Sequence, residues 1–329
     1  MNKIFNISHV LLLTAILLLT AACSSDSSND VQPSPTPNTS QEISLIPTVW
    51  QMAEATRATT FDNAAALQAQ GSFTCGVYQQ NSITEYISPV QVNWNSSSWR
   101  FSDGSHPWPD YNLDFFAYMP AIADLTTQSP FISGITYSVI DANADTHPDT
   151  QEVAFTCTNI FVNNGGQSSY YREFVYGFVP GQNKTNNGSG VVLTFQHPFA
   201  RIKLQFSSSQ ENIQINTITL KNIKNNGSYT HSSGWTPSGD ATNLVLTFEG
   251  NAANFDANEE IGTYLMIPQE WSGGIDVNAT WNVWGESQTK TVSTTLSPIT
   301  WLRGNSYTYT FNITETDLVV NTSKYTEQW

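Results

Sequence analysis

Basic residues are scarce in this sequence. Its 329 residues include 12 lysines and arginines against 27 aspartates and glutamates, which gives a formal net charge of −15. Proteins that bind nucleic acids or anionic membranes cluster their basic residues, and no basic stripe interrupts this chain. We therefore expect no nucleic-acid partner. Charged residues make up 12% of the chain, so asparagine, serine, threonine and glutamine must keep its surface soluble.

Cysteine is rare as well, with three in the chain: Cys23, Cys75 and Cys157. In an exported protein, Cys75 and Cys157 could form a disulfide. Two free thiols buried at apolar strand positions explain them equally well. The sequence leaves both possibilities open.

Signatures of catalysis are missing too. The chain has no Gly-x-Ser-x-Gly elbow, no phosphate-binding loop and no dinucleotide fingerprint, and its five histidines lie far apart without metal-ligand spacing. A surface hydrolase would need a pair of carboxylates in a cleft, which leaves no trace in sequence. We predict no enzymatic activity and no cofactor.

The first residues predict export. Lys3 precedes an apolar run from Val10 to Leu19, and small residues separate that run from Cys23. The run is too short for a bilayer-spanning helix, which needs roughly 20 apolar residues, and residues 1–22 are typical of a secretory signal peptide. A cysteine in this position resembles the lipobox of bacterial lipoproteins, in which the mature chain begins at a cysteine that carries lipid, palmitate included. An ordinary signal with a leftover cysteine is the alternative.

Residues 23–41 are rich in serine, asparagine, aspartate and proline, and we expect a disordered tether. From residue 42 onward, aromatic and β-branched residues recur in short runs that favour strands. A helix is predicted at Asp62–Gln70, with Asp62 as its cap.

Alternation of apolar and polar residues is clearest at 200–206, 244–248 and 307–313, as expected for antiparallel sheets with one solvated face. Shorter strands are predicted at Ser72–Tyr78, Leu113–Tyr118, Gly134–Ile140, Val153–Phe155, Glu173–Phe178, Ile213–Ile223, Gly262–Ile267 and Ile275–Val283. Many short strands with frequent turns predict an all-β fold of sandwich-like domains. We expect two domains, 42–185 and 186–329, divided within Gln182–Gly190. That polar stretch could equally be a hairpin tip.

One acidic segment follows the spacing of a calcium-binding loop. Asp141, Asn143, Asp145, Asp149 and Glu152 match ligand positions 1, 3, 5, 9 and 12 of an EF-hand. The glycine that such a loop needs at position 6 is absent, and the flanks favour strands. An acidic, solvated turn is the alternative to this weak calcium candidate.

Tryptophan is abundant, and exposed aromatic faces suit stacking against sugars. Such a platform could draw on several tryptophans, although the same residues could instead fill a core that is poor in leucine and isoleucine. The residues concerned are Trp94, Trp99, Trp108, Trp235 and Trp271.

Both ends of the predicted globular part carry apolar strands. Near the start, Ile43, Leu45 and Val49 alternate with polar residues, and the intervening Pro47 suits an edge strand. Near the end, Leu318, Val319 and Val320 follow the last regular core strand. These residues could pair within their own domain, or they could complete the sheet of a neighbouring molecule.

Several blocks resemble the fimbrillin-like proteins of the Bacteroidales, the type V pilins, and together they cover most of the mature chain. They are Trp108-Pro109, Leu113–Pro120, Phe195–Lys203, Ile218–Lys221, Tyr264–Gln269 and Gly304–Tyr309.

The resemblance implies two transthyretin-like β-sandwich domains in tandem, export as a lipoprotein to the outer membrane, and polymerisation into a cell-surface pilus, or fimbrium, that contributes to adhesion. It also implies cleavage between Arg57 and Ala58 by an arginine-specific surface protease. The released first strand then leaves a groove that residues 317–329 of a neighbouring pilin subunit would fill, head to tail. A host glycan or protein would be the adhesion ligand.

The rival interpretation is a monomeric surface lipoprotein that binds glycans through exposed aromatic residues. A place in the stalk, at the tip or at the anchor of a pilus is equally compatible with the sequence.

Overall fold

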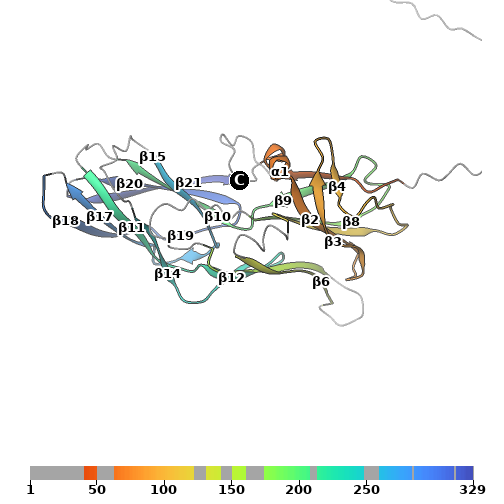
Figure 1. Cartoon of the computed structure of the whole chain (residues 1–329). Coiled ribbons are helices and arrows are strands. Elements are labelled where there is room, and N and C mark those ends of the chain that lie inside the picture. Colours follow the sequence, from red (N-terminus) through yellow and green to blue (C-terminus); the bar gives the residue numbers. More distant parts are fainter. Residues whose placement is uncertain are drawn as a thin grey trace, which may run out of the picture. The chain divides into compact units, whose positions relative to one another are not determined.

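The computed structural model describes residues 41–49, 63–121, 131–141, 150–160, 174–207, 213–247, 259–283, 285–314 and 316–328 (Figure 1). For 259–261 and 322–328 the description covers the backbone alone. Strands dominate these residues, and α1 (Ala64–Gln70) is the helix among them. The predicted all-β class is therefore confirmed.

Seven strands from the earlier part of the chain form a sheet that closes on itself as a barrel, in the order β1-β4-β3-β2-β5-β8-β9. Its central strands are buried on both faces. On β5, Phe115 and Ala117 face the barrel core, whereas Phe116 and Tyr118 belong to the larger core of the rest of the molecule. The strands are β1 (Leu45–Val49), β2 (Ser72–Gln79), β3 (Glu85–Trp94), β4 (Trp99–Phe101), β5 (Leu113–Met119), β8 (Val175–Gln182) and β9 (Val191–Gln196).

The helix α1 lies between β1 and β2 in the chain and buries Leu67 in the barrel core. Its cap is Asn63, whose Oδ1 accepts a hydrogen bond from the Ala66 amide at 2.9 Å. The predicted helix is confirmed, but the prediction of Asp62 as its cap was wrong, because Asn63 has the extended backbone that a cap requires. Asp62 itself lies outside the described residues.

The later part of the chain forms two four-stranded sheets that share one apolar core. The first has the order β15-β10-β20-β21, and the second β14-β11-β17-β18. Among the described residues, β16 (Glu270–Trp271) and β19 (Ile299–Thr300) form a separate two-stranded sheet that packs on the same core. The strands are β10 (Ala200–Ser207), β11 (Ile213–Ile223), β14 (Thr242–Thr247), β15 (Glu259–Met266), β17 (Asp276–Val283), β18 (Thr289–Thr295), β20 (Asn305–Ile313) and β21 (Leu318–Gln328).

A further sheet joins strands from both sides of the predicted domain boundary, in the order β13-β12-β7-β6. It pairs β12 (Asn226–Thr230) with β7 (Thr150–Cys157), and it is completed by β6 (Ile132–Ile140) and β13 (Gly234–Ser238). A division at Gln182–Gly190 would therefore split this sheet between two domains. The tandem transthyretin-like sandwiches and their boundary stay predictions.

Two strand pairs are parallel, which the expectation of antiparallel sheets did not include: β1 with β9, and β10 with β20. The expected solvated face is also missing where β10 meets β20. Arg201 and Ser306 are buried there, and the Arg201 Nε donates a hydrogen bond to the Ser306 Oγ at 3.3 Å. The alternation marks the apolar face of these strands correctly, but their central place in the sheet buries part of the polar face as well.

A buried carboxylate ties the barrel to the sheet of β6 and β7. Asp114 is fully buried on β5. Its oxygens accept hydrogen bonds from the Tyr137 hydroxyl at 2.8 Å, the Gly181 amide at 2.7 Å and the Asn81 amide at 3.3 Å. These donors come from three separate segments, so one carboxylate fixes their relative positions.

A second polar network connects β8, β12 and the turn before β20. Arg303 donates to the Tyr229 hydroxyl, which lies 2.6 Å from the Tyr176 hydroxyl, and that hydroxyl lies 3.0 Å from the His231 Nδ1. The donors and acceptors of this network all match when Tyr229 donates to Tyr176 and the Tyr176 hydroxyl donates to the His231 Nδ1. Burial lowers the pKa of His231, Arg303 lowers that pKa further, and Glu152 acts in the opposite direction. The fold therefore favours a neutral ring.

We expect Asp114→Ala to lower the free energy of unfolding by about 2–4 kcal/mol, because each buried donor left without an acceptor costs roughly 1–3 kcal/mol. Urea denaturation measures this change. Asp103→Ala is the control, since its exposed ion pair with His106 contributes at most about 1 kcal/mol. Equal effects of the two substitutions would contradict the assigned role of Asp114.

Acid should destabilise the protein through His231. In the unfolded chain the histidine pKa has its ordinary value of about 6.5, and in the folded protein the pKa of His231 is lower. As pH falls through the unfolded pKa, the unfolded state binds more protons than the folded state. Stability is therefore lost between about pH 7 and pH 5. Urea midpoints at several pH values should therefore fall more steeply for the wild type than for His231→Gln. Identical pH profiles would refute the assignment.

Candidate functional site

The first strand, β1, is the centre of the candidate site, and its side chains alternate as predicted. Ile43, just before the strand, and Leu45 are buried, with 6% of each exposed. Val49 is half-buried against the same core. Ile46 points outward and is 39% exposed. This pattern gives the strand one apolar face toward the barrel and one toward solvent.

One side of β1 is paired along its whole length. It runs parallel to β9, from the pair Leu45 and Val191 to the pair Val49 and Phe195. The Val191 amide donates to the Ser44 carbonyl at 2.8 Å. These partners lie far apart in the sequence, so the chain's own turns do not hold β1 in place.

The other side of β1 is nearly unpaired. Its register with β4 consists of one pair, Leu45 with Trp99. Pro47 has no amide hydrogen and cannot donate to a ladder. Within the described residues, the barrel is closed here by that single pair, and the interpretation of β1 as an edge-like strand fits this geometry.

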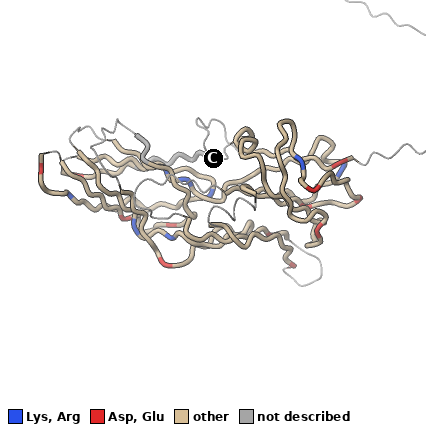
Figure 2. Tube along the Cα trace, viewed as in Figure 1, with Lys and Arg blue, Asp and Glu red and all other residues tan. Residues whose placement is uncertain are grey.

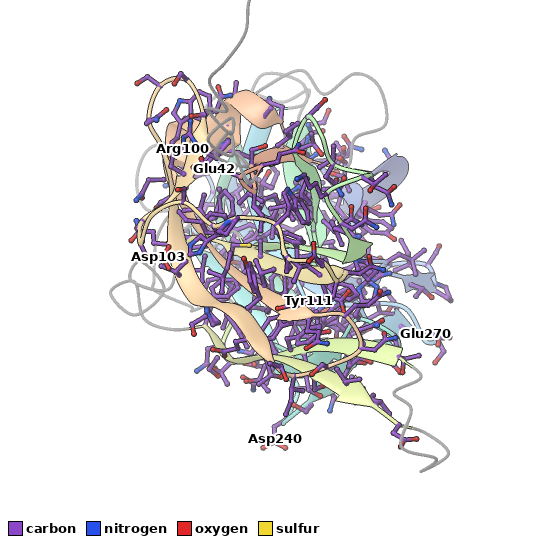
Figure 3. All side chains as sticks on the ribbon, turned by 90° about the vertical axis from the view of Figure 1, so that its right-hand side faces the viewer. Glu42, Arg100, Asp103, Tyr111, Asp240 and Glu270 are labelled. Carbon is purple, nitrogen blue, oxygen red and sulfur yellow. The ribbon has the colours of Figure 1, made fainter. Side chains whose placement is uncertain are left out.

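Residues just before β1 are held by the loop between β4 and β5. The Ile43 amide donates to the His106 carbonyl at 2.8 Å, and the Trp108 amide donates to the Gln41 carbonyl at 3.1 Å. Glu42 forms an isolated bridge with Pro107, and its side chain is exposed like that of Arg100 on β4 (Figure 3). The loop before β5 therefore positions the entry to the strand.

Beneath β1 lies a cluster of fully buried apolar residues. Phe73 contacts Trp99 and Phe195, with ring centroids 5.0 Å and 5.5 Å apart. Leu67 of α1 and Leu193 of β9 belong to the same cluster. Withdrawal of β1 would expose this cluster together with one edge of β9.

Gly190 is a residue of the site that sequence reasoning missed. It precedes β9 with a φ of +122°, and a Cβ placed there would lie 2.8 Å from the Ser44 Oγ and 3.1 Å from side-chain atoms of Ile46. Glycine therefore allows the close approach of β1 to this turn. The one signal in the sequence was its place between a polar stretch and an apolar run.

The tail lies on its own sheet. β21 pairs antiparallel with β20, from Leu318 and Ile313 to Gln328 and Asn305. Leu318 is buried, Val319 is 49% exposed, and Val320 is half-buried. This is the arrangement of an ordinary last strand, and it leaves β21 at the edge of the sheet. The donor role of the tail stays a prediction.

Three predicted processing positions lie outside the described residues: Cys23, Arg57 and Ala58. In chain order, Arg57 and Ala58 fall between β1, which ends at Val49, and α1, which begins at Ala64. No helix among the described residues is both long and apolar enough to span a bilayer.

The calcium candidate is only partly described, since Asn143, Asp145 and Asp149 lie outside the description. Asp141 follows β6, and Glu152 lies on β7. The Glu152 carboxylate accepts hydrogen bonds from the hydroxyl and the amide of Ser232. The parts of the chain that the structure describes hold no group of three or more acidic, histidine or cysteine residues arranged for a metal. Calcium binding stays a prediction.

Cys75 and Cys157 are both buried and form no disulfide with each other. Cys75 belongs to the barrel core and Cys157 to the larger core. Burial raises the pKa of the Cys75 thiol far above its usual range, which makes it unreactive.

The proposed aromatic platform is not assembled. Trp99, Trp108 and Trp271 are buried, whereas Trp94 and Trp235 are partly exposed and lie on different sheets. The Trp235 indole nitrogen donates to the Pro198 carbonyl at 2.5 Å. Most of these tryptophans therefore supply packing, as the alternative interpretation held.

Several solved structures share this fold. A fimbrial protein from Bacteroides vulgatus is 14% identical, with a TM-score of 0.56 over 86% of this chain and 98% of that chain. A proposed cell adhesion protein from Bacteroides ovatus is 16% identical, with a TM-score of 0.53 over 87% and 97% of the two chains. Another from Bacteroides uniformis is 14% identical, with a TM-score of 0.51 over 88% and 98%. At such identities the likeness concerns the fold.

No curated protein matches the sequence. The model of the fimbrillin-like family, in contrast, matches residues 56–329. That match spans well over half of the chain and includes all the blocks on which the resemblance rests. This chain belongs to the fimbrillin-like family.

Proposed function

We propose that this protein is a structural subunit of a cell-surface fimbria that contributes to adhesion and assembles by strand exchange. The observation that carries the proposal is the position of β1, which is fully paired with β9 and barely paired with β4. Family membership and the fold shared with a fimbrial protein of Bacteroides vulgatus support the same role.

Cleavage between Arg57 and Ala58 by an arginine-specific surface protease would sever β1 from the rest of the barrel. The cut falls after β1 and before α1 in the chain, so β1 would then be held by non-covalent contacts alone. If Cys23 carries a lipid in the outer membrane, that lipid lies on the same side of the cut. One cleavage would therefore both free the subunit from its anchor and open the groove.

The emptied groove would need a replacement strand. Burying an aliphatic side chain such as Ile43 or Leu45 contributes roughly 1.5–3 kcal/mol, and both are buried in the barrel core. Withdrawal would also leave the outer edge of β9 unpaired, and such an edge is a template for another strand.

The tail is a suitable replacement strand because it is long and lies at an edge. β21 is 11 residues long, against five for β1. Its removal would leave β20 paired with β10, so the core of the sheet would persist. Because the tail and the groove are different surfaces, each subunit would offer one of each, and the contact would propagate head to tail.

We expect trypsin to convert the uncleaved chain into oligomers by a cut after Arg57, which intact mass and size-exclusion chromatography would detect. The Arg57→Gln variant should gain no oligomers on trypsin treatment beyond those of the untreated protein, and neither should a cleaved chain that lacks 317–329. Oligomers that form equally well without Arg57 cleavage would overturn the proposed activation.

Gly190→Ala should weaken the hold on β1, because its added methyl group meets Ser44 and Ile46. After cleavage, the peptide that ends at Arg57 should dissociate several-fold faster, as native mass spectrometry over time would show. Gly104→Ala is a matched control, since Gly104 has a φ of +123° and nothing within 4 Å of an added Cβ. If both variants accelerate release equally, backbone strain rather than contact with β1 is the cause.

A further inference from the structure

The outer edge of β18 is an open strand edge distinct from the edges of β1 and β21. β18 is paired on one side with β17 over its full length, from Thr289 and Asn282 to Thr295 and Asp276. It ends its sheet, and among the described residues no strand pairs with its other side (Figure 1). β21 lies nearby but belongs to the other sheet.

This edge lacks proline and bulges, two of the devices that usually protect an exposed strand. Its inward face carries one charge, Lys290, on the same side of the strand as the core-packed Val292. The edge strand β13 carries Pro237, and β6 has an irregular register near Gly134, whose φ is +60°. β18 instead runs through seven residues without proline, glycine or a register shift. Its one charged residue is Lys290, which already pairs with Glu286 at 3.2 Å.

The sheet behind this edge is uncharged across its middle. One row of threonines crosses all four strands in register, and Thr217 Oγ1 lies 2.7 Å from Thr280 Oγ1. The next row contains valine, threonine, asparagine and serine. The threonine row consists of Thr247, Thr217, Thr280 and Thr291. Charged positions are sparse along the described trace (Figure 2).

Charge restricts where two copies of this chain can meet. Each copy carries a formal net charge of −15, so surfaces rich in acidic residues repel one another. The β18 edge has no acidic residue. Contact through this edge therefore avoids placing carboxylates against carboxylates.

The sequence of β18 is also compatible with pairing to itself. In an antiparallel pair centred on Val292, Thr291 faces Ser293, Lys290 faces Thr294, and Thr289 faces Thr295 of the second copy. Cross-strand pairs of β-branched and hydroxyl residues are favourable. The two lysines are four residues apart along the strands, about 14 Å, which exceeds the Debye length of roughly 8 Å at physiological salt.

We propose that two copies of this chain associate through antiparallel pairing of their β18 strands about Val292. The contact is two-fold and closed, so it joins two molecules without propagating. It is independent of β1, β21 and cleavage. Repeated along two fimbriae, many such weak contacts would hold the filaments side by side, because linked binding sites raise avidity.

Disulfide trapping tests the register. In an antiparallel pair, opposite Cα atoms are about 4.5–5.5 Å apart, within the range that a disulfide spans. In an uncleaved chain with Cys23→Ser, Val292→Cys should form a disulfide-linked dimer on mild oxidation. Val245→Cys, on the opposite edge strand β14 of the same sheet, should give at least tenfold less. Equal trapping of both, or of neither, would overturn the proposed register.

Charge exchange tests the same contact without cysteine. Thr291 and Ser293 are exposed on β18 and would face each other across the pair. Thr291→Glu with Ser293→Glu should abolish association in sedimentation equilibrium, because like charges would meet twice. Thr291→Lys with Ser293→Glu should restore it through two ion pairs. If the wild type is monomeric at every concentration, or if the two double variants associate equally, the proposal is wrong.

Discussion

The parallel pairing of β1 with β9 is the constraint on which the rest of this architecture depends. It closes the barrel, covers the aromatic cluster around Phe73, and joins the start of the described chain to residues roughly midway along it. The pairing of β1 is also one-sided, because its other edge pairs with β4 at Leu45 alone. A strand held this way contributes burial and main-chain hydrogen bonds on one side without being locked between two ladders.

Strand β9, which would border the proposed groove, is directly connected to the sheet that carries the tail. β9 is followed within a few residues by β10, which pairs with β20, which in turn pairs with β21. The connecting residues are fixed by the Trp235 hydrogen bond to the Pro198 carbonyl and by the Gly304 amide, which donates to the Phe199 carbonyl at 2.8 Å. The proposed acceptor strand β9 and the proposed donor strand β21 are therefore connected through paired strands.

Alternation in the sequence predicted strands and their inward faces well. Ile213–Ile223 has its predicted bounds, and Ile43, Leu45 and Val49 face the barrel core as expected. Alternation could not predict which strands pair or in which direction they run, because it does not encode the neighbouring strand or its orientation. The pairing of β7 with β12 and of β10 with β20 arises from tertiary packing. The same holds for Arg201, which is polar by pattern and buried because two strands flank it.

The buried hydrogen-bond networks of the fold could not be predicted from the sequence, for a related reason. Asp114 lies in an apolar run, and its donors come from residues 81, 137 and 181. Tyr176, His231 and Arg303 likewise meet only when three separate segments fold together. No spacing within one segment could reveal such clusters, whereas Gly190, followed by an apolar run, left a local trace that pattern reasoning could have used.

Connectivity explains why the proposed removal of β1 would leave the hairpins of the barrel in place. β2 with β3, β3 with β4, and β8 with β9 are neighbours in both sequence and sheet, so short turns hold each pair together. β1 has no such neighbour, and both of its partners are distant in the chain. A cut in the segment that follows it removes its covalent link to the barrel and leaves every hairpin intact. The strand proposed to exchange is thus the one whose loss would affect the fewest local contacts, and the aromatic cluster beneath it would make its replacement favourable.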